Sequence, residues 1–119
     1  MEVTKALNRY KDFIQEHHDM IEVFVGQSTD ASLTHINIYP AQFNYSYERN
    51  DYQIVVELAL PGIEITDAVI TADEVAATIE LDALDDLRLS NYNTEFYFNE
   101  QIAGTVILFI VNLFIQECR

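Results

Sequence analysis

The chain has 119 residues, of which 50% are hydrophobic, and it carries 20 acidic residues against 6 basic ones, for a formal net charge of -14. This length and hydrophobic content predict a single folded domain over residues 1–119 and argue against a disordered chain. The charge opposes direct nucleic-acid binding and docking on an anionic membrane, because both need Lys and Arg. It favours a basic partner surface, or it serves only solubility.

The first part of the chain predicts one helix and two strands. Apolar residues recur at helical spacing from Val3 to His17, with polar residues on the other face. The run Ile21–Val25 is typical of a short strand, and Gly26 begins a turn. Leu33–Tyr39 alternates as a second strand. Pro40 is expected to end this strand or to lie at a sheet edge, because proline cannot donate to a ladder.

The centre of the chain predicts a hairpin. Gln42–Arg49 alternates aromatic with polar residues, as a half-buried strand does. Asn50-Asp51 is a plausible hairpin turn, and Tyr52–Leu60 then forms the partner strand. Pro61-Gly62 breaks the chain.

A second helix and two further strands complete the pattern. Thr66–Leu84 contains no Gly or Pro, and Thr71 with Glu74 resembles a capping box. Thr94–Asn99 and Thr105–Ile115 read as the last two strands. The order predicts an α+β fold, a mostly antiparallel sheet of about five to six strands with two helices packed on one face.

The last strand is apolar on both faces, which a sheet covered by helices on one side does not require. Two helices cannot cover both sides of such a sheet, so the segment predicts a subunit interface. The alternative is a sheet that curls and covers itself. Tyrosines of the central hairpin suit an interface as well. The predicted interface residues are Ile107, Phe109, Val111, Leu113, Ile115, Tyr45 and Tyr47.

Reactive side chains form no recognisable catalytic, cofactor-binding or metal-binding motif. His17 and His18 point about 100° apart on a helix, so a zinc enzyme built on them and His35 is a weak alternative. Cys118, the single cysteine, cannot form a disulfide within the chain. The start of the chain has no apolar signal core and the longest apolar stretch is too short to span a bilayer as a helix, so we expect a cytoplasmic protein that is not an enzyme.

The order of elements and three segments resemble the tail completion, or tail terminator, proteins of tailed bacteriophages. The aromatic strand Phe43–Tyr47, the hydrophobic strand Tyr52–Leu60, and the closing runs Thr94–Phe98 and Val106–Glu117 are similar to strands of that family. The resemblance implies a virion structural protein without catalytic residues. Such proteins form a ring, commonly a hexamer, that ends the tail tube and joins it to the head.

By that resemblance the expected partners are copies of the chain itself, a tail tube protein and a head–tail connector protein. The expected locations are the host cytoplasm during assembly and the tail of the virion. The net charge leaves a different class of function open. The chain would then be an acidic DNA mimic, or an immunity-type inhibitor, that binds a basic protein.

Overall fold

Two helices and five strands make up the fold. The structure, a computed structural model, describes residues 3–26, 33–47, 49–81 and 87–116, with side chains from residue 7 to residue 114. The elements are α1 (Val3–His17), β1 (Glu22–Val25), β2 (His35–Tyr45), β3 (Arg49–Leu60), α2 (Ile65–Glu80), β4 (Arg88–Asn99) and β5 (Gly104–Gln116). The strand order is β1-β2-β3-β5-β4, and every pair except β1 with β2 is antiparallel. The predicted α+β fold is confirmed.

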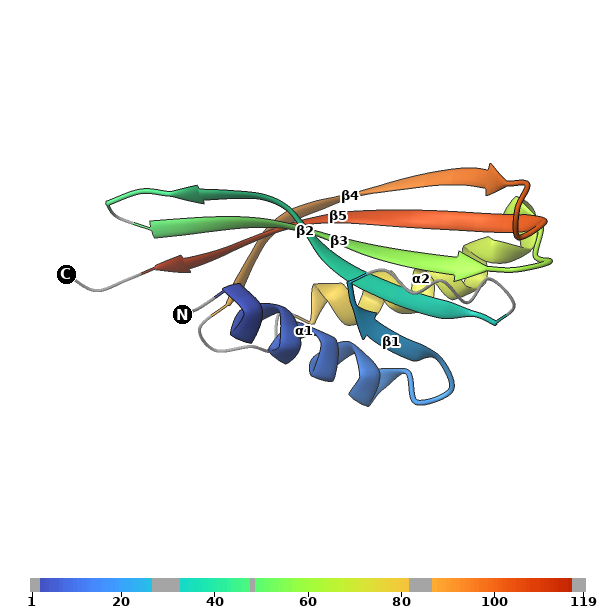
Figure 1. Ribbon diagram of the computed structural model, residues 1–119, viewed down its shortest axis with the longest axis horizontal. Helices are drawn as coiled ribbons and strands as arrows, with labels where there is room; N and C mark the ends of the chain where they lie inside the picture. The colour runs from blue at the N-terminus through green and yellow to red at the C-terminus, as the bar shows by residue number, and fades with distance from the viewer. Residues whose placement is uncertain (1–2, 27–32, 48, 82–86, 117–119) are drawn as a thin grey trace.

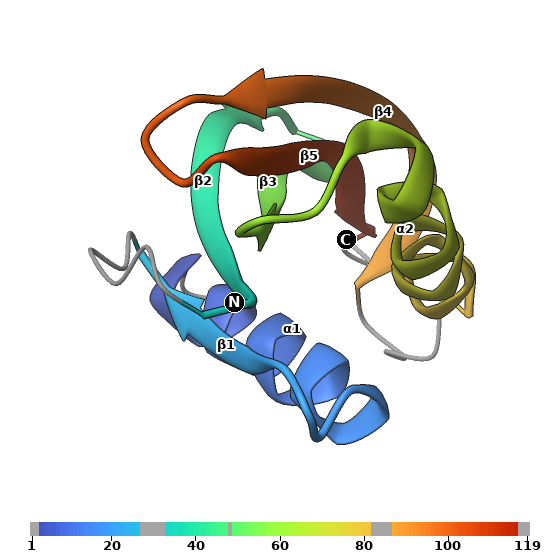
Figure 2. The same ribbon diagram turned by 90° about the vertical axis from the view of Figure 1, so that its right-hand side faces the viewer.

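Both helices lie on one side of the curved sheet (Figures 1 and 2). The core fills the space between them, because alternate residues of the two central strands point toward the helices. Small residues on α2 let that helix pack closely. The core consists mainly of Leu7, Tyr10, Phe13, Ile14, Ile36, Ile38, Tyr52, Ile54, Val56, Leu58, Ala68, Ala72, Val75, Ile79, Ile107, Phe109, Val111 and Leu113.

Two predicted boundaries around the central hairpin are wrong. The predicted break between the strands Leu33–Tyr39 and Gln42–Arg49 is absent, because β2 continues through Pro40 with a bulge between Pro40 and Gln42. Of the two expectations for Pro40, the edge position is the one observed. The strand tolerates proline there because β1 pairs with β2 only as far as Ile38, which leaves Pro40 on a sheet edge. The turn also lies earlier than Asn50-Asp51, since the Ser46 N–H donates to the Arg49 carbonyl at 3.1 Å.

The second helix also begins and ends differently from the prediction. Its N-cap is Glu64, so Thr71 and Glu74 lie inside the helix and do not form a capping box. The helix ends at Glu80, and the predicted extension to Leu84 reaches residues outside the described ranges. Helical spacing located α2 correctly, but the start of α2 depends on the turn that follows β3.

The sheet is longer than the helices that cover it. The molecule measures 49 × 24 × 23 Å along its principal axes. The β2–β3 hairpin and the end of β5 extend past both helices at one end of the long axis (Figure 1). Side chains at this projecting end therefore have little of the chain's own surface to pack against.

Candidate protein-binding surfaces

The sheet has one face without helices, and its side chains are set by the register of β3, β5 and β4. Along β5 this outer face carries Val106, Leu108, Ile110, Asn112 and Phe114, because their alternating neighbours point into the core. Across the sheet they lie beside residues of the adjoining strands. We call the apolar part of this face the outer-face patch: Tyr39, Val55, Tyr97, Val106, Leu108 and Ile110.

A carboxylate stands at the centre of the outer-face patch. The Tyr39 hydroxyl donates to Glu57 at 3.1 Å, and the Asn37 side-chain amide donates to the same carboxylate at 3.4 Å. Burial together with the charge of Glu57 raises the pKa of Tyr39 to about 12, and the same two causes raise the pKa of Tyr97. Both tyrosines therefore keep their phenol protons at neutral pH and present a polar edge on an otherwise apolar patch.

A row of side-chain amides separates the outer-face patch from the hairpin tip. Gln53 donates to Asn112 at 3.2 Å, and Asn112 donates to Asn91 at 2.6 Å, so the row crosses three strands. Beyond it, Arg49 pairs with Asp51 at 3.0 Å and lies over the ring of Phe114, 4.8 Å from the ring centroid. The outer face thus divides into an apolar middle and a polar, charged region next to the tip.

Four of the predicted interface residues lie in the core of a single chain. Ile107, Phe109 and Val111 are 0% exposed and Leu113 is 3% exposed, so these side chains are not available to a second chain. The prediction divided β5 into the correct two sets but assigned the interface to the wrong one, because α1 and α2 cover this set. In the other set Val106 is also buried, at 3% exposed, while Leu108, Ile110 and Phe114 are half-buried on the face without helices.

The remaining predicted interface residues lie at the projecting end. Tyr45 and Tyr47 are 62% and 77% exposed, and together they form what we call the hairpin tip. Ile115 pairs with Asn50 in the ladder, but its side chain lies outside the described ones. The two tyrosines are therefore accessible to another chain, while nothing is stated for Ile115.

Each of the three histidines makes a hydrogen bond, His17 and His35 to nearby carbonyls and His18 to Thr78 of α2. His17 Nδ1 bonds to the Phe13 carbonyl at 2.9 Å, and His35 Nδ1 bonds to the Leu33 carbonyl at 2.8 Å. Thr78 already donates its hydroxyl proton to a carbonyl, so His18 Nε2–H donates to Thr78 Oγ1 at 2.7 Å. Among the described residues, no group of three or more His, Cys, Asp or Glu is arranged to hold a metal ion.

A second exposed surface lies where β4 runs beside α2. The Tyr92 hydroxyl donates to the Glu80 carboxylate, and this bond, with burial, raises the pKa of Tyr92 to about 12. Because Glu80 reaches Tyr92, the flank of α2 that contains Glu80 faces β4. Ile65 and Val69 precede Glu80 on this flank at helical spacing.

Apolar side chains of β4 point to the same side as Tyr92. Phe96 and Phe98 pair across the ladder with Ile107 and Thr105, whose side chains are buried on the helix side of the sheet. We call the four exposed apolar residues between the elements the α2–β4 strip: Ile65, Val69, Phe96 and Phe98, which are 42%, 41%, 40% and 53% exposed. The sequence pattern identified β4 as a strand but gave no sign that its aromatic residues stay exposed.

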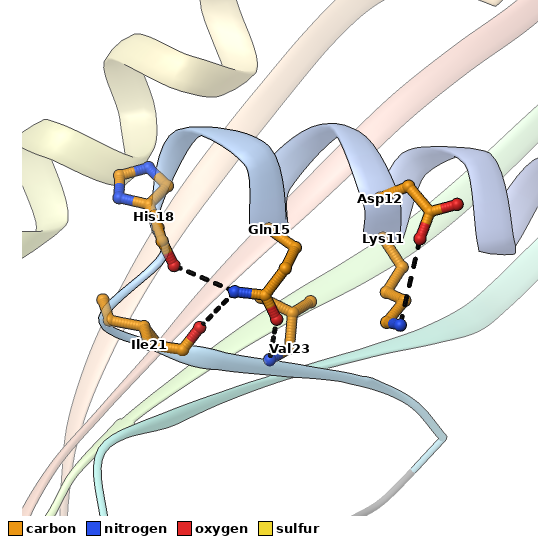
Figure 3. A network of polar contacts seen from close by, with 6 residues as sticks. All are labelled: Lys11, Asp12, Gln15, His18, Ile21 and Val23. Atoms are coloured by element: carbon orange, nitrogen blue, oxygen red, sulfur yellow. Dashed lines mark hydrogen bonds and ion pairs between the residues drawn. The ribbon is translucent and has the colours of Figure 1, made fainter.

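The two edge strands of the sheet have different surroundings. At the β1 edge, the Gln15 side chain accepts a bond from the Val23 N–H at 3.0 Å and donates to the Ile21 and His18 carbonyls at 2.7 and 3.0 Å (Figure 3). The carboxamide thus occupies the place that a neighbouring strand would take. At the opposite edge, β4 has β5 as its single neighbour in the described sheet.

Comparisons with known proteins add no family to this description. A scan against models of protein families finds no match, and a search of curated proteins finds none either. Within the described part of the chain, no helix has the length and apolar character needed to cross a membrane. The function is therefore argued from the surfaces.

Proposed function

We propose that this chain is a structural protein that assembles with copies of itself, and that the assembly is a ring that ends a bacteriophage tail tube. One observation carries the assembly: accessible apolar side chains lie at two places separated along the sheet, exposed Tyr45 and Tyr47 at the hairpin tip, and exposed Tyr97 with half-buried Tyr39, Leu108 and Ile110 in the outer-face patch. A contact that joins two different surfaces of identical chains is heterologous, and it produces a ring when the rotation closes.

The two surfaces lie at different places along the molecule. Leu108 and Ile110 are half-buried side chains on a face that no helix covers, whereas Tyr45 and Tyr47 project from the end of the molecule. Seven residues of β5 separate Leu108 from the position paired with the tip, which is roughly 24 Å along a strand. One chain can therefore contact two neighbours at once, one at the tip and one at the patch.

The tail-terminator role rests on the resemblance of the strands to that phage family. It implies a tail tube protein and a head–tail connector protein as further partners and the virion tail as the final location. The high negative charge supports a channel role, because an acidic lumen repels DNA and eases its passage. The proposed role needs no catalytic residue.

Solution mass measurement on paired variants tests the assembly. Leu108→Lys places a cation in the outer-face patch, between Glu57 and Glu95 on the adjoining strands. Cross-strand pairs of opposite charge stabilise a sheet by about 0.2–1 kcal/mol, so we expect this variant to fold at least as stably as the wild type. Tyr45→Ser with Tyr47→Ser removes the tip instead and leaves the patch intact.

For wild-type chain at micromolar concentration we expect an oligomer, with annular particles in negative-stain images. Each variant alone should be a monomer, since each lacks one half of the contact. An equimolar mixture of the two variants should contain dimers, because one intact tip can still meet one intact patch. Wild type that stays monomeric, or a variant that still self-associates, would contradict the proposal.

A further inference from the structure

We propose that the outer edge of β4 binds an extended, basic and apolar segment of another protein as an additional strand of the sheet. Three observations lead to this inference: the open edge of β4, the α2–β4 strip beside it, and the acidic charge around both. The inference does not depend on ring assembly, because it uses neither the hairpin tip nor Leu108 and Ile110.

The edge itself supplies the main-chain groups. β4 has twelve residues, and it pairs with β5 on one side only within the described sheet. An edge strand presents a row of N–H and C=O groups to an incoming chain, and proteins that avoid such pairing use Lys, Pro or a covering side chain there. From Ser90 to Asn99 the strand contains no Lys, Arg or Pro. At the start of the β1 edge, in contrast, Gln15 bonds to the Val23 N–H and the Ile21 carbonyl.

The α2–β4 strip supplies contacts for side chains of the added strand. A strand laid along β4 would point alternate side chains to the helix side of the sheet, beside Phe96 and Phe98. These rings are 40% and 53% exposed and lie next to the flank of α2 that carries Ile65 and Val69. The side chains at these positions of the partner would therefore be apolar, since they bury area against exposed rings.

The charge around β4 selects the other side chains of the partner. Glu95 lies on the outer face of β4, and Glu100 follows the strand. Along α2 the exposed carboxylates of Asp73 and Glu80 act on Tyr92 of the same strand. Opposite charges favour directly facing positions across strands, so a residue facing Glu95 would be Lys or Arg. The fitting segment thus alternates apolar with basic residues, as in strand-addition complexes whose pockets read alternate side chains.

A second copy of this chain fits the edge less well. An isologous β4 pair would bring two acidic edges together in a protein whose net charge is -14, and like charges facing each other across strands are destabilising. A basic partner removes this repulsion, and its binding should weaken as salt is added.

A peptide that alternates valine with lysine over eight residues tests the proposal. We expect saturable binding to the full chain by fluorescence anisotropy at low salt, and slower hydrogen exchange of amides within Ser90–Asn99 when the peptide is bound. Glu95→Lys should weaken binding about fivefold through loss of the facing charge, and Phe98→Ser about tenfold through loss of apolar contact. Neither residue is part of the core, so both variants should fold.

Matched controls separate the edge from general charge and hydrophobicity. Glu16→Lys makes the same charge change on α1, and Ile70→Ser removes an exposed apolar residue on the solvent side of α2. Both should bind as the wild type does, and so should Tyr45→Ser with Tyr47→Ser, which removes the hairpin tip and tests ring assembly instead. Absence of saturable binding at millimolar peptide, equal binding by Glu95→Lys and Glu16→Lys, or unchanged exchange in β4 would overturn the inference. So would protection of the β4 amides by self-association in the absence of peptide.

Discussion

The two edges of this sheet differ in how their main-chain groups are satisfied. At the β1 edge, a helix carries Gln15 to the strand, and one carboxamide bonds to the Val23 N–H and the Ile21 carbonyl. At the β4 edge, the neighbouring helix α2 contributes Ile65 and Val69 beside exposed rings, and the hydrogen bond from Tyr92 of β4 to Glu80 of α2 joins two side chains. A covered edge ends a sheet, whereas an open edge with apolar neighbours can accept another strand.

Replacing Gly104 should have the largest effect, because this glycine holds the β4–β5 hairpin against the end of β3. A Cβ at Gly104 would lie 2.2 Å from the Leu60 carbonyl oxygen and 2.6 Å from the Gly62 nitrogen. Backbone atoms cannot rotate away, so we expect Gly104→Ala to lower the free energy of unfolding by about 3 kcal/mol, the upper range for overpacking. Urea unfolding measures this, and exchange of the β4 amides should quicken.

The matched control lies just after β1. Gly26 has φ +102, but no atom lies within 4 Å of a Cβ built there. Gly26→Ala should therefore cost only the backbone strain of a positive φ, about 1 kcal/mol. Equal losses for the two variants would show that close approach at Gly104 does not support the β4 edge.

Gln15→Leu should uncover the β1 edge. It keeps the helix propensity and size of the residue but leaves the Val23 N–H and two carbonyls without their side-chain partner. We expect a loss of about 2 kcal/mol in the free energy of unfolding, and faster exchange of the Val23 amide. Gln15→Glu still accepts a bond from Val23 but cannot donate when ionised. Its free energy of unfolding should therefore lie between those of the wild type and Gln15→Leu. A loss below about 0.5 kcal/mol for Gln15→Leu would mean that water replaces the carboxamide without cost.

The contact of Gln15 with the β1 edge shows what cannot be predicted from the sequence: contacts between elements that are formed only in the folded chain. Alternation sorted β5 correctly into two faces, and helical spacing found α1 and α2, because both depend on local geometry. Which face of β5 the helices cover is a tertiary fact, and so the sequence predicted Phe109 and its neighbours for an interface although the helices bury them within one chain. In the same way, Gln15 reads as a solvent-facing residue of α1 until β1 folds back beside it. The sequence left open whether Pro40 ends its strand or lies at a sheet edge, because a strand can be central at Ile38 and an edge two residues later.

His18 connects the end of α1 with α2, since its ring bonds to Thr78 of α2 while its carbonyl accepts from Gln15 of α1. His18→Phe should lower the free energy of unfolding by about 1 kcal/mol near pH 7.5. Burial lowers the pKa of His18, although Glu74 opposes the shift. The unfolded chain therefore takes up the proton first, and the advantage of the wild type should shrink as the pH falls below 6.5. Unfolding at several pH values, compared with His17→Phe, would check this, and a difference independent of pH would contradict it.

Tyr92→Phe should have the smallest effect, because it removes one partly exposed bond between β4 and α2. We expect a loss of about 0.5 kcal/mol near pH 8. The bond to Glu80 and burial raise the pKa of Tyr92 to about 12, so the contribution of the neutral phenol is complete below pH 10 and is lost as the pH rises toward 12. Tyr39 and Tyr97 also have raised pKa values. Both residues are present in the wild type and in Tyr92→Phe, so their contributions cancel in the difference between the two free energies of unfolding. Urea unfolding of both proteins near pH 8 and pH 11 gives that difference. If it stays constant, the Tyr92–Glu80 bond does not hold α2 beside the open edge, and the α2–β4 strip must be positioned by the apolar contacts alone.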